Sequence, residues 1–127
     1  GHRRVTLTDR CPMVPLLQAN IESNGLQDHA DAIELDWGDA PAISGINTVI
    51  MSDCVYLREA CPLLLETLNA LAPDQIIWAQ EMRGIEEDFK ELLRDSGWSI
   101  HEVRPPAEND YACEDICVFQ IFPAEKK

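Results

Sequence analysis

Residues 48–56 read TVIMSDCVY, and this stretch decides the fold. Residues 48–51 form an apolar run that is rich in β-branched side chains and too short for a helix, which indicates a strand buried on both faces. The run ends at Ser52 and Asp53, so polar side chains follow directly after a buried strand. Because ligands of open α/β sheets bind beyond the carboxyl ends of the strands, residues 52–56 are a candidate functional loop.

The sequence after this loop alternates between helical and strand patterns. Apolar residues recur at helical spacing over residues 60–71 until Pro73 interrupts them, and residues 75–79 then indicate another buried strand. An amphipathic helix is expected over residues 85–93, ending before Gly97. Its solvent-facing side is predicted to carry the charged residues Glu86, Glu87, Asp88, Glu91 and Arg94.

The sequence before the loop shows the same alternation. Residues 5–8 have the pattern of a strand that ends at Asp9, and residues 12–21 have helical spacing that leads to a stop signal at Gly25. Residues 32–37 are predicted to form the next strand, which glycine, aspartate and proline then close.

Two further strands are expected near the end of the chain, over residues 99–103 and 116–122, with no helical pattern between them. They should therefore pair antiparallel, whereas the earlier strands alternate with helices and favour a mostly parallel sheet covered on both faces. A chain of 127 residues is long enough for one core, so we interpret residues 1–127 as one domain or part of one. The expected fold class is α/β, with a doubly wound, Rossmann-like sheet and a reversed C-terminal strand.

The composition disfavours several functional classes. The 10 Lys and Arg residues against 23 Asp and Glu residues leave a net charge of −13, which repels phosphate backbones and anionic lipid surfaces. A nucleic-acid partner is therefore unfavourable, and no apolar run approaches the roughly 20 residues of a membrane span. The 5 cysteines contain no C-x-x-C pair and the 3 histidines are scattered, so no metal site is expected. The odd cysteine count favours reduced thiols in a cytoplasmic protein, with the nucleus as the second possibility.

Three local strings resemble the seven-strand, class I S-adenosylmethionine-dependent methyltransferases, and within them the protein-lysine methyltransferase group. VTLTD at residues 5–9 is similar to that group's second strand, and LDWG at residues 35–38 is similar to its L-x-W-G segment after the third strand. SDCVY at residues 52–56 resembles its D-x-x-Y motif after the fourth strand. AQEMR at residues 79–83 is a weaker similarity, at a position where the family often has polar and basic residues near the substrate entrance. The resemblance extends over residues 5–122.

The resemblance implies S-adenosylmethionine as the cofactor and assigns roles to the matching positions. Asp9 would accept hydrogen bonds from the ribose hydroxyls, and Trp37 would lie against the adenine. Two structural alternatives stay open, because Asp9 could be the N-cap of the next helix and a lone tryptophan is more often a core residue. The expected cofactor-binding residues are Asp9, Arg10, Asp36, Trp37 and Ser52, and the expected catalytic residues are Asp53 and Tyr56.

The implied reaction transfers a methyl group to an amine, which in that group is a protein lysine side chain. A lysine ammonium, with an ordinary pKa of about 10.4, must lose its proton before the nitrogen attacks the methyl carbon. Asp53 and the ring of Tyr56 are expected to hold the ammonium in a partly dry pocket by charge and cation–π contact. The alternatives are an RNA or small-molecule methyltransferase, or a non-catalytic α/β interaction module or fragment.

The sequence departs from the family at the glycine-rich cofactor loop. No two of its 6 glycines lie close enough together to form such a loop after a first strand. The chain is therefore expected to be the C-terminal part of a methyltransferase domain and to be inactive alone. The absent strand would lie between the strands that end at Asp9 and Asp53, so we expect a companion fragment, a strand exchanged with a second copy, or direct pairing of these two strands.

Overall fold

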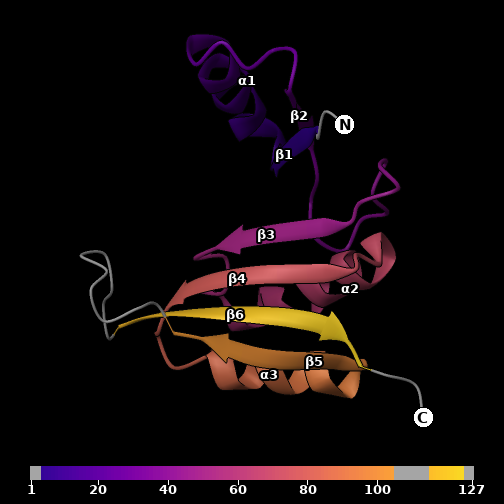
Figure 1. Cartoon of the computed structure of the whole chain (residues 1–127), viewed down its shortest axis with the longest axis vertical. Helices are drawn as coiled ribbons and strands as arrows, with labels where there is room; N and C mark the ends of the chain where they lie inside the picture. The colour runs from indigo at the N-terminus through magenta and orange to yellow at the C-terminus, as the bar shows by residue number, and fades with distance from the viewer. Residues whose placement is uncertain (1–3, 105–114, 125–127) are drawn as a thin grey trace. The chain divides into compact units, whose positions relative to one another are not determined.

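The computed structural model describes residues 4–104 and 115–124, and the chain divides into two compact units between Asp39 and Ala40 (Figure 1). The described residues contain six strands, as the sequence predicts. These strands form a two-stranded sheet and a four-stranded sheet, so the prediction of a single sheet is not met. Alternation of strands and helices indicates the direction of each strand, but it does not determine which strands become neighbours.

The first unit has a β-α-β arrangement. Strands β1 (Val5–Asp9) and β2 (Ala30–Glu34) pair parallel along their whole lengths. A short 3-10 helix, η1 (Cys11–Met13), leads into helix α1 (Val14–Ser23). Both have a proline in the first turn. Backbone N–H groups at this position have no acceptor within the helix, so a residue without an N–H costs no hydrogen bond. The helix ends as predicted, before Gly25.

Strand β2 begins and ends earlier than the predicted residues 32–37. The chain turns after Leu35, because the N–H of Asp39 donates to the carbonyl of Asp36 at 3.1 Å. Gly38 has a φ of 94° in this turn, a conformation that glycine adopts without steric cost. Trp37 therefore lies in the turn that follows the strand, which contradicts the predicted strand bounds and agrees with the similarity to the L-x-W-G segment.

The second unit is a four-stranded mixed sheet with two α-helices. Its elements are β3 (Thr48–Ser52), η2 (Arg58–Ala60), α2 (Cys61–Leu71), β4 (Gln75–Glu81), α3 (Glu86–Asp95), β5 (Trp98–Val103) and β6 (Ile116–Pro123). The strand order is β3-β4-β6-β5, and β3 is parallel to β4. Strand β6 runs antiparallel to β4 and β5 and lies between them, which confirms the reversed C-terminal strand (Figure 1).

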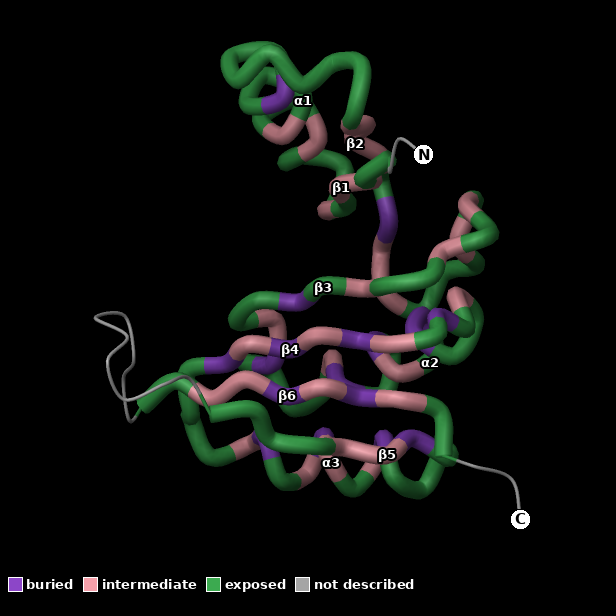
Figure 2. Tube along the Cα trace, in the orientation of Figure 1, coloured by how far each residue is buried: buried purple, intermediate pink, exposed green. Residues whose placement is uncertain are grey.

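The core of the second unit is built on β4 and β6. Trp78 and Phe119 are opposite each other on these strands, with ring centroids 4.9 Å apart, and Phe89 of α3 packs edge-on against Trp78 at 5.3 Å. Figure 2 shows buried residues alternating with less buried ones along β4, so one face of the strand points into this core. Burying one such side chain contributes about 1.5–3 kcal/mol, which makes β4 a rigid base for the residues at its end.

The opposite face of this sheet carries exposed apolar side chains. Ile50 lies between Val49 and Met51 on β3, so it points to the face opposite to theirs, and it is 75% exposed. Val103 of β5 and Ile116 of β6 are exposed as well. Within the second unit, apolar side chains on this face of the sheet are therefore exposed.

Strands β1 and β3, which are expected to flank a further strand, each have a single partner in the described part of the chain. Within residues 4–104 and 115–124, β1 pairs with β2 alone and β3 pairs with β4 alone. Of the three alternatives for the strands ending at Asp9 and Asp53, direct pairing is not seen in the described residues. Each of these strands keeps one edge whose backbone groups have no sheet partner among the described residues.

Candidate functional site

Asp53 begins the loop after β3, at the carboxyl end of the parallel pair β3 and β4. Its N–H donates to the carbonyl of Ala79 at 2.8 Å, so the hydrogen-bond ladder of the sheet extends to this residue. Asp53 has a φ of 54°, in the left-handed region that aspartate and asparagine tolerate better than most other residues. The chain therefore turns sharply at Asp53 and leaves its carboxylate at the edge of the sheet.

Gln80 of β4 binds this loop from the interior of the unit. Its side chain donates from Nε2 to Asp53 Oδ1 at 3.3 Å and to the carbonyl of Val55 at 2.9 Å. Its Oε1 accepts the N–H of Val55 at 3.3 Å. Gln80 is only 1% exposed, and a buried amide is stable only when both of its ends are hydrogen-bonded. The bonds to Asp53 and Val55 meet that requirement and fasten the loop to the sheet.

Arg83 contacts the other oxygen of the Asp53 carboxylate. Its guanidinium donates to Oδ2 of Asp53 at 2.5 Å and lies 3.3 Å from the carboxylate of Glu81. The hydrogen bond and charge of Asp53 raise the pKa of Arg83 above its ordinary value. The side chains of Arg83 and Asp53 are 42% and 44% exposed, so water screens the pair and its contribution to stability is small.

Glu86, predicted on the solvent-facing side of α3, is buried instead. Its carboxylate accepts the backbone N–H groups of Arg83 and Gly84, the latter at 2.7 Å. Burial by itself would raise the pKa of Glu86, but hydrogen bonds from these N–H groups and its own outweigh burial, and the pKa is lowered. Helical periodicity predicted an exposed Glu86 because it does not take into account that the free N–H groups before a helix attract a carboxylate of its first turn. Glu86 thus fixes the backbone from which Arg83 extends.

Tyr56 and Ser52, on either side of Asp53 in sequence, are both exposed, Tyr56 by 57%. Val55 is 1% exposed and bonded to Gln80, so the backbone that leads to Tyr56 is held while the ring faces water. The partly dry pocket expected around Asp53 and Tyr56 therefore stays a prediction.

In the first unit, the residues that follow β1 and β2 come together at the carboxyl end of this parallel pair. The N–H of Leu35 donates to the carbonyl of Asp9 at 2.9 Å, and Arg10 Nε lies 3.6 Å from Asp36 Oδ1. Asp9 Oδ1 accepts the N–H of Arg10 at 2.7 Å, and neither η1 nor α1 has a side-chain N-cap, so the helix-capping alternative for Asp9 is wrong. The carboxylates of Asp9 and Asp36 supply acceptors that fit the hydroxyls of a nucleoside.

Trp37 lies in the turn next to Asp36 and is half-buried. It is not among the core residues of the first unit, where Ile21 and Leu35 are buried. A ring that is partly open to solvent keeps a flat apolar surface on which a heterocycle can stack. Its contact with adenine remains a prediction.

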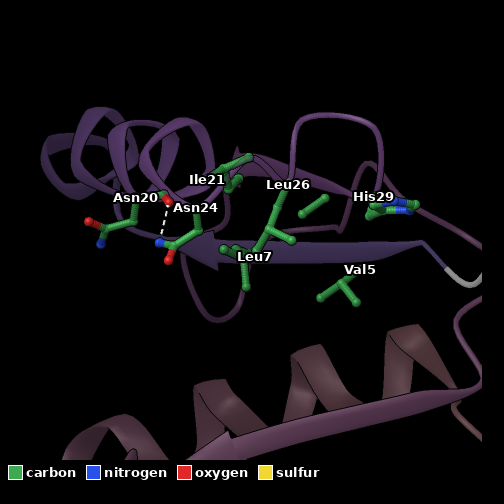
Figure 3. A pocket seen from close by; sticks show the side chains of 8 residues that line it. Val5, Leu7, Asn20, Ile21, Asn24, Leu26 and His29 are labelled. Carbon is green, nitrogen blue, oxygen red and sulfur yellow. Dashed lines mark hydrogen bonds between the residues drawn. The ribbon is translucent and has the colours of Figure 1, made fainter.

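The first unit also contains a cavity of about 300 Å³ that belongs to none of the expected sites (Figure 3). It lies between β1 and α1, and its lining includes Val5, Leu7, Ile21 and Leu26. None of the expected cofactor-binding residues lines it. In the described part of the chain, no group of His, Cys, Asp and Glu side chains could hold a metal ion, and no helix is long and apolar enough to cross a membrane.

The expected site residues divide between the two units. The first unit contains Asp9, Arg10, Asp36 and Trp37, and the second contains Ser52, Asp53 and Tyr56. Each group lies at the carboxyl ends of a parallel strand pair, β1 with β2 and β3 with β4. Sequence reasoning missed the roles of Gln80 and Glu86. The AQEMR string was the only signal for Gln80. For Glu86, the helical periodicity predicted an exposed side chain, whereas the side chain is buried.

Comparison with known protein families identifies the family of this chain. Residues 1–95 match the family model described as lysine methyltransferase. The chain belongs to the lysine methyltransferase family. The family uses S-adenosylmethionine, and the matched residues include the VTLTD, LDWG and SDCVY strings, so the resemblance seen in these strings is confirmed.

Two curated relatives are protein-lysine methyltransferases. The chain is 35% identical over 95 residues to the protein-lysine N-methyltransferase EFM6 of Saccharomyces cerevisiae, an alignment that covers 63% of this chain and 39% of that protein. It is 33% identical over 115 residues to the protein N-lysine methyltransferase METTL21A of Danio rerio, covering 84% and 52% respectively. The chain therefore spans about half the length, or less, of these relatives.

Solved methyltransferase structures share the fold. The methyltransferase domain of bacterial CtHen1-C superposes with a TM-score of 0.74 at 7% identity, covering 97% of this chain and 78% of that one. The O-methyltransferase NcsB1, crystallised with S-adenosylmethionine, has a TM-score of 0.68 at 13% identity and covers 93% and 41%. At such identities the likeness shows the fold alone, and it confirms the prediction of a Rossmann-like α/β methyltransferase fold.

Proposed function

We propose that this chain is part of an enzyme that transfers a methyl group from S-adenosylmethionine to a lysine side chain of a protein. The observation that carries this proposal is the match of residues 1–95 to the lysine methyltransferase family. The Asp53 loop supports it, because it presents a carboxylate at the carboxyl end of a parallel strand pair. Protein is also the acceptor that the names of both curated relatives state for those proteins.

Asp53 and Tyr56 are proposed to bind the acceptor lysine. The carboxylate attracts the ammonium, and the exposed Tyr56 ring offers a cation–π surface to the same group. Orientation of the nitrogen is the main requirement of an in-line displacement, so these residues are assigned to positioning the substrate. Removal of the lysine proton is a separate step that neither residue is required to perform.

Asp9, Arg10, Asp36, Trp37 and Ser52 are proposed to bind the cofactor. When bound, S-adenosylmethionine supplies an activated methyl group. Asp9 and Asp36 would accept hydrogen bonds from the ribose hydroxyls, and the 3.6 Å contact between Arg10 and Asp36 would keep the Asp36 carboxylate oriented. Trp37 would stack on the adenine.

The position of this chain within its domain is also a proposal. We assign residues 1–127 to the C-terminal part of a methyltransferase domain, and we propose that another strand pairs with the open edge of β3. That strand would come from elsewhere in the gene product, from a companion fragment or from a second copy of the chain. A single exposed edge strand readily accepts such a partner. Sedimentation of the isolated chain tests this, since a monomer that binds S-adenosylmethionine tightly would contradict it.

A cytoplasmic or nuclear location is proposed for the protein. Cys61 is a buried thiol, and burial raises its pKa and that of Cys117, so both are poorly reactive. Such thiols suit a reducing compartment. Fractionation of cells that produce the tagged gene product would test this location.

The decisive experiment incubates the full-length gene product with labelled S-adenosylmethionine and cell extract. The expected result is label in protein, recovered as methyl-lysine after hydrolysis, and calorimetric binding of S-adenosylmethionine that weakens in Asp9→Ala. Label recovered in RNA or in small molecules would contradict the proposed acceptor. Absence of cofactor binding to the full-length gene product would contradict methyl transfer altogether.

A further inference from the structure

Gln80 is the most heavily bonded buried side chain around the Asp53 loop. Its Nε2 shares two hydrogens among three acceptors, which are the carbonyls of Val55 at 2.9 Å and Glu81 at 3.0 Å and Asp53 Oδ1 at 3.3 Å. Its Oε1 accepts the indole N–H of Trp78 at 3.1 Å. The orientation of the amide is unambiguous, because a flipped group would place its oxygen against three acceptors. The side chain thus connects the aromatic core to the functional loop.

The two oxygens of the Asp53 carboxylate have donors of different kinds. Oδ1 accepts the buried amide of Gln80, whose position is fixed by its other bonds. Oδ2 accepts the guanidinium of Arg83, which is 42% exposed and extends from a long flexible chain. Water competes with the second contact far more than with the first. A cation from solvent can therefore replace Arg83 at Oδ2 while Gln80 keeps Oδ1 in place.

We infer that Gln80 is the positioning residue of the substrate site, holding the Asp53 carboxylate and the backbone before Tyr56 so that Oδ2 can receive the ammonium of the acceptor lysine. This inference rests on the proposed function. Gln80 itself does not touch the substrate and acts through Asp53. The requirement for such a residue comes from Asp53 having a φ of 54°, because a backbone in this region stays there only when surrounding contacts hold it.

The test measures label transfer from S-adenosylmethionine into protein of a cell extract by the full-length gene product. Gln80→Met, which keeps the side-chain length and removes every hydrogen bond, is compared with wild type and with Asp53→Asn. We expect the maximal rate of Gln80→Met to fall about 10- to 100-fold, because a small misplacement of a reacting group costs about that much. Its KM for S-adenosylmethionine should stay within about twofold of the wild-type value. In the Asp53→Asn background, Gln80→Met should change the rate by less than about threefold, because coupled residues are not additive.

Two further variants separate positioning from stability. Leu93→Ala, in the core of α3, destabilises the same unit without touching the loop, and its folded fraction should keep the wild-type rate. If Gln80→Met does not fold, Gln80→Glu replaces it, since its carboxylate still accepts the N–H groups of Val55 and Trp78 but cannot donate to Asp53 when ionised. The maximal rate of Gln80→Glu should fall as well, and in the Asp53→Asn background this substitution should also change the rate by less than about threefold.

Equal losses from the Gln80 substitution in both backgrounds would overturn the inference, as would a change confined to the KM for S-adenosylmethionine. In either case the wild-type transfer and its dependence on Asp53 would leave the proposed function standing. A wild-type protein that transfers no label, or an Asp53→Asn variant with the wild-type rate, would instead remove the proposed site and the inference with it.

Discussion

Arg83 donates a hydrogen bond of 2.5 Å to Oδ2 of Asp53, across 30 residues of sequence. The carboxylate that we propose for binding a lysine ammonium thus already holds a cation of the protein. Because both side chains are more than 40% exposed, this ion pair is weak enough to exchange. Arg83 and the substrate are therefore expected to compete for one oxygen.

Replacing Arg83 should strengthen substrate binding. In Arg83→Met, we expect the KM for the protein acceptor to fall about two- to fivefold, because a weak, water-screened contact that competes for Oδ2 is removed. Arg83→Lys keeps the charge and serves as the control. Initial rates measured against acceptor concentration give the result, and a higher KM in Arg83→Met would show that Arg83 assists binding.

Substitutions of the expected catalytic residues should reduce turnover and leave the fold intact. Asp53→Asn and Tyr56→Phe should each lower the rate of label transfer, Asp53→Asn by about tenfold or more through lost orientation of the amine. Asp53→Ala should do the same and also lose about 1 kcal/mol of stability, because alanine tolerates a φ of 54° less well. Circular dichroism checks the fold, and wild-type turnover in both Asp53→Asn and Tyr56→Phe would move the catalytic assignment elsewhere.

The contribution of Glu86 to stability should depend on pH. Its pKa is lowered in the folded chain, so its stabilisation is present above the unfolded-state pKa of about 4.3 and is lost as the pH falls through the folded-state pKa. Glu86→Gln should therefore destabilise the protein at neutral pH by about 1–3 kcal/mol, and the loss should shrink as the pH falls below the unfolded-state pKa of about 4.3. Urea unfolding at neutral pH and at a series of acidic pH values measures this, with the exposed Glu87→Gln as the matched control. An equal loss at all of these pH values would contradict the role of the charge.

The end of α2 offers a stabilising substitution. Ala72 forms its C-cap with a φ of 46° and donates its N–H to the carbonyl of Leu68 at 3.0 Å. Glycine has no steric penalty in this conformation, so Ala72→Gly should stabilise the chain by about 1 kcal/mol. Urea midpoints at constant m-value provide the measurement. Ala70→Gly, inside the helix, should destabilise by a similar amount, and a loss of stability in Ala72→Gly would refute the strain at this cap.

The sequence by itself determined the elements, their order and the family. Apolar runs such as residues 48–51 and the helical spacing of residues 60–71 are local patterns, so they predict a strand and a helix without reference to the rest of the chain. The D-x-x-Y and L-x-W-G strings are equally local, and they located Asp53 and Trp37 just after strands. The predicted bounds of strands were less accurate where a turn ends the strand, as in the turn at Gly38 after β2.

Only the tertiary structure decided which residues hold the site together. The bonds from Gln80 and Arg83 to Asp53 join residues 27 and 30 positions apart, and no periodicity relates such residues. Glu86 is buried because unsatisfied N–H groups before α3 need an acceptor, a demand that appears only when the chain has turned. The order β3-β4-β6-β5 within the second unit has the same origin, because strand neighbours are chosen by packing and backbone pairing across the fold and not by the local pattern of any one segment.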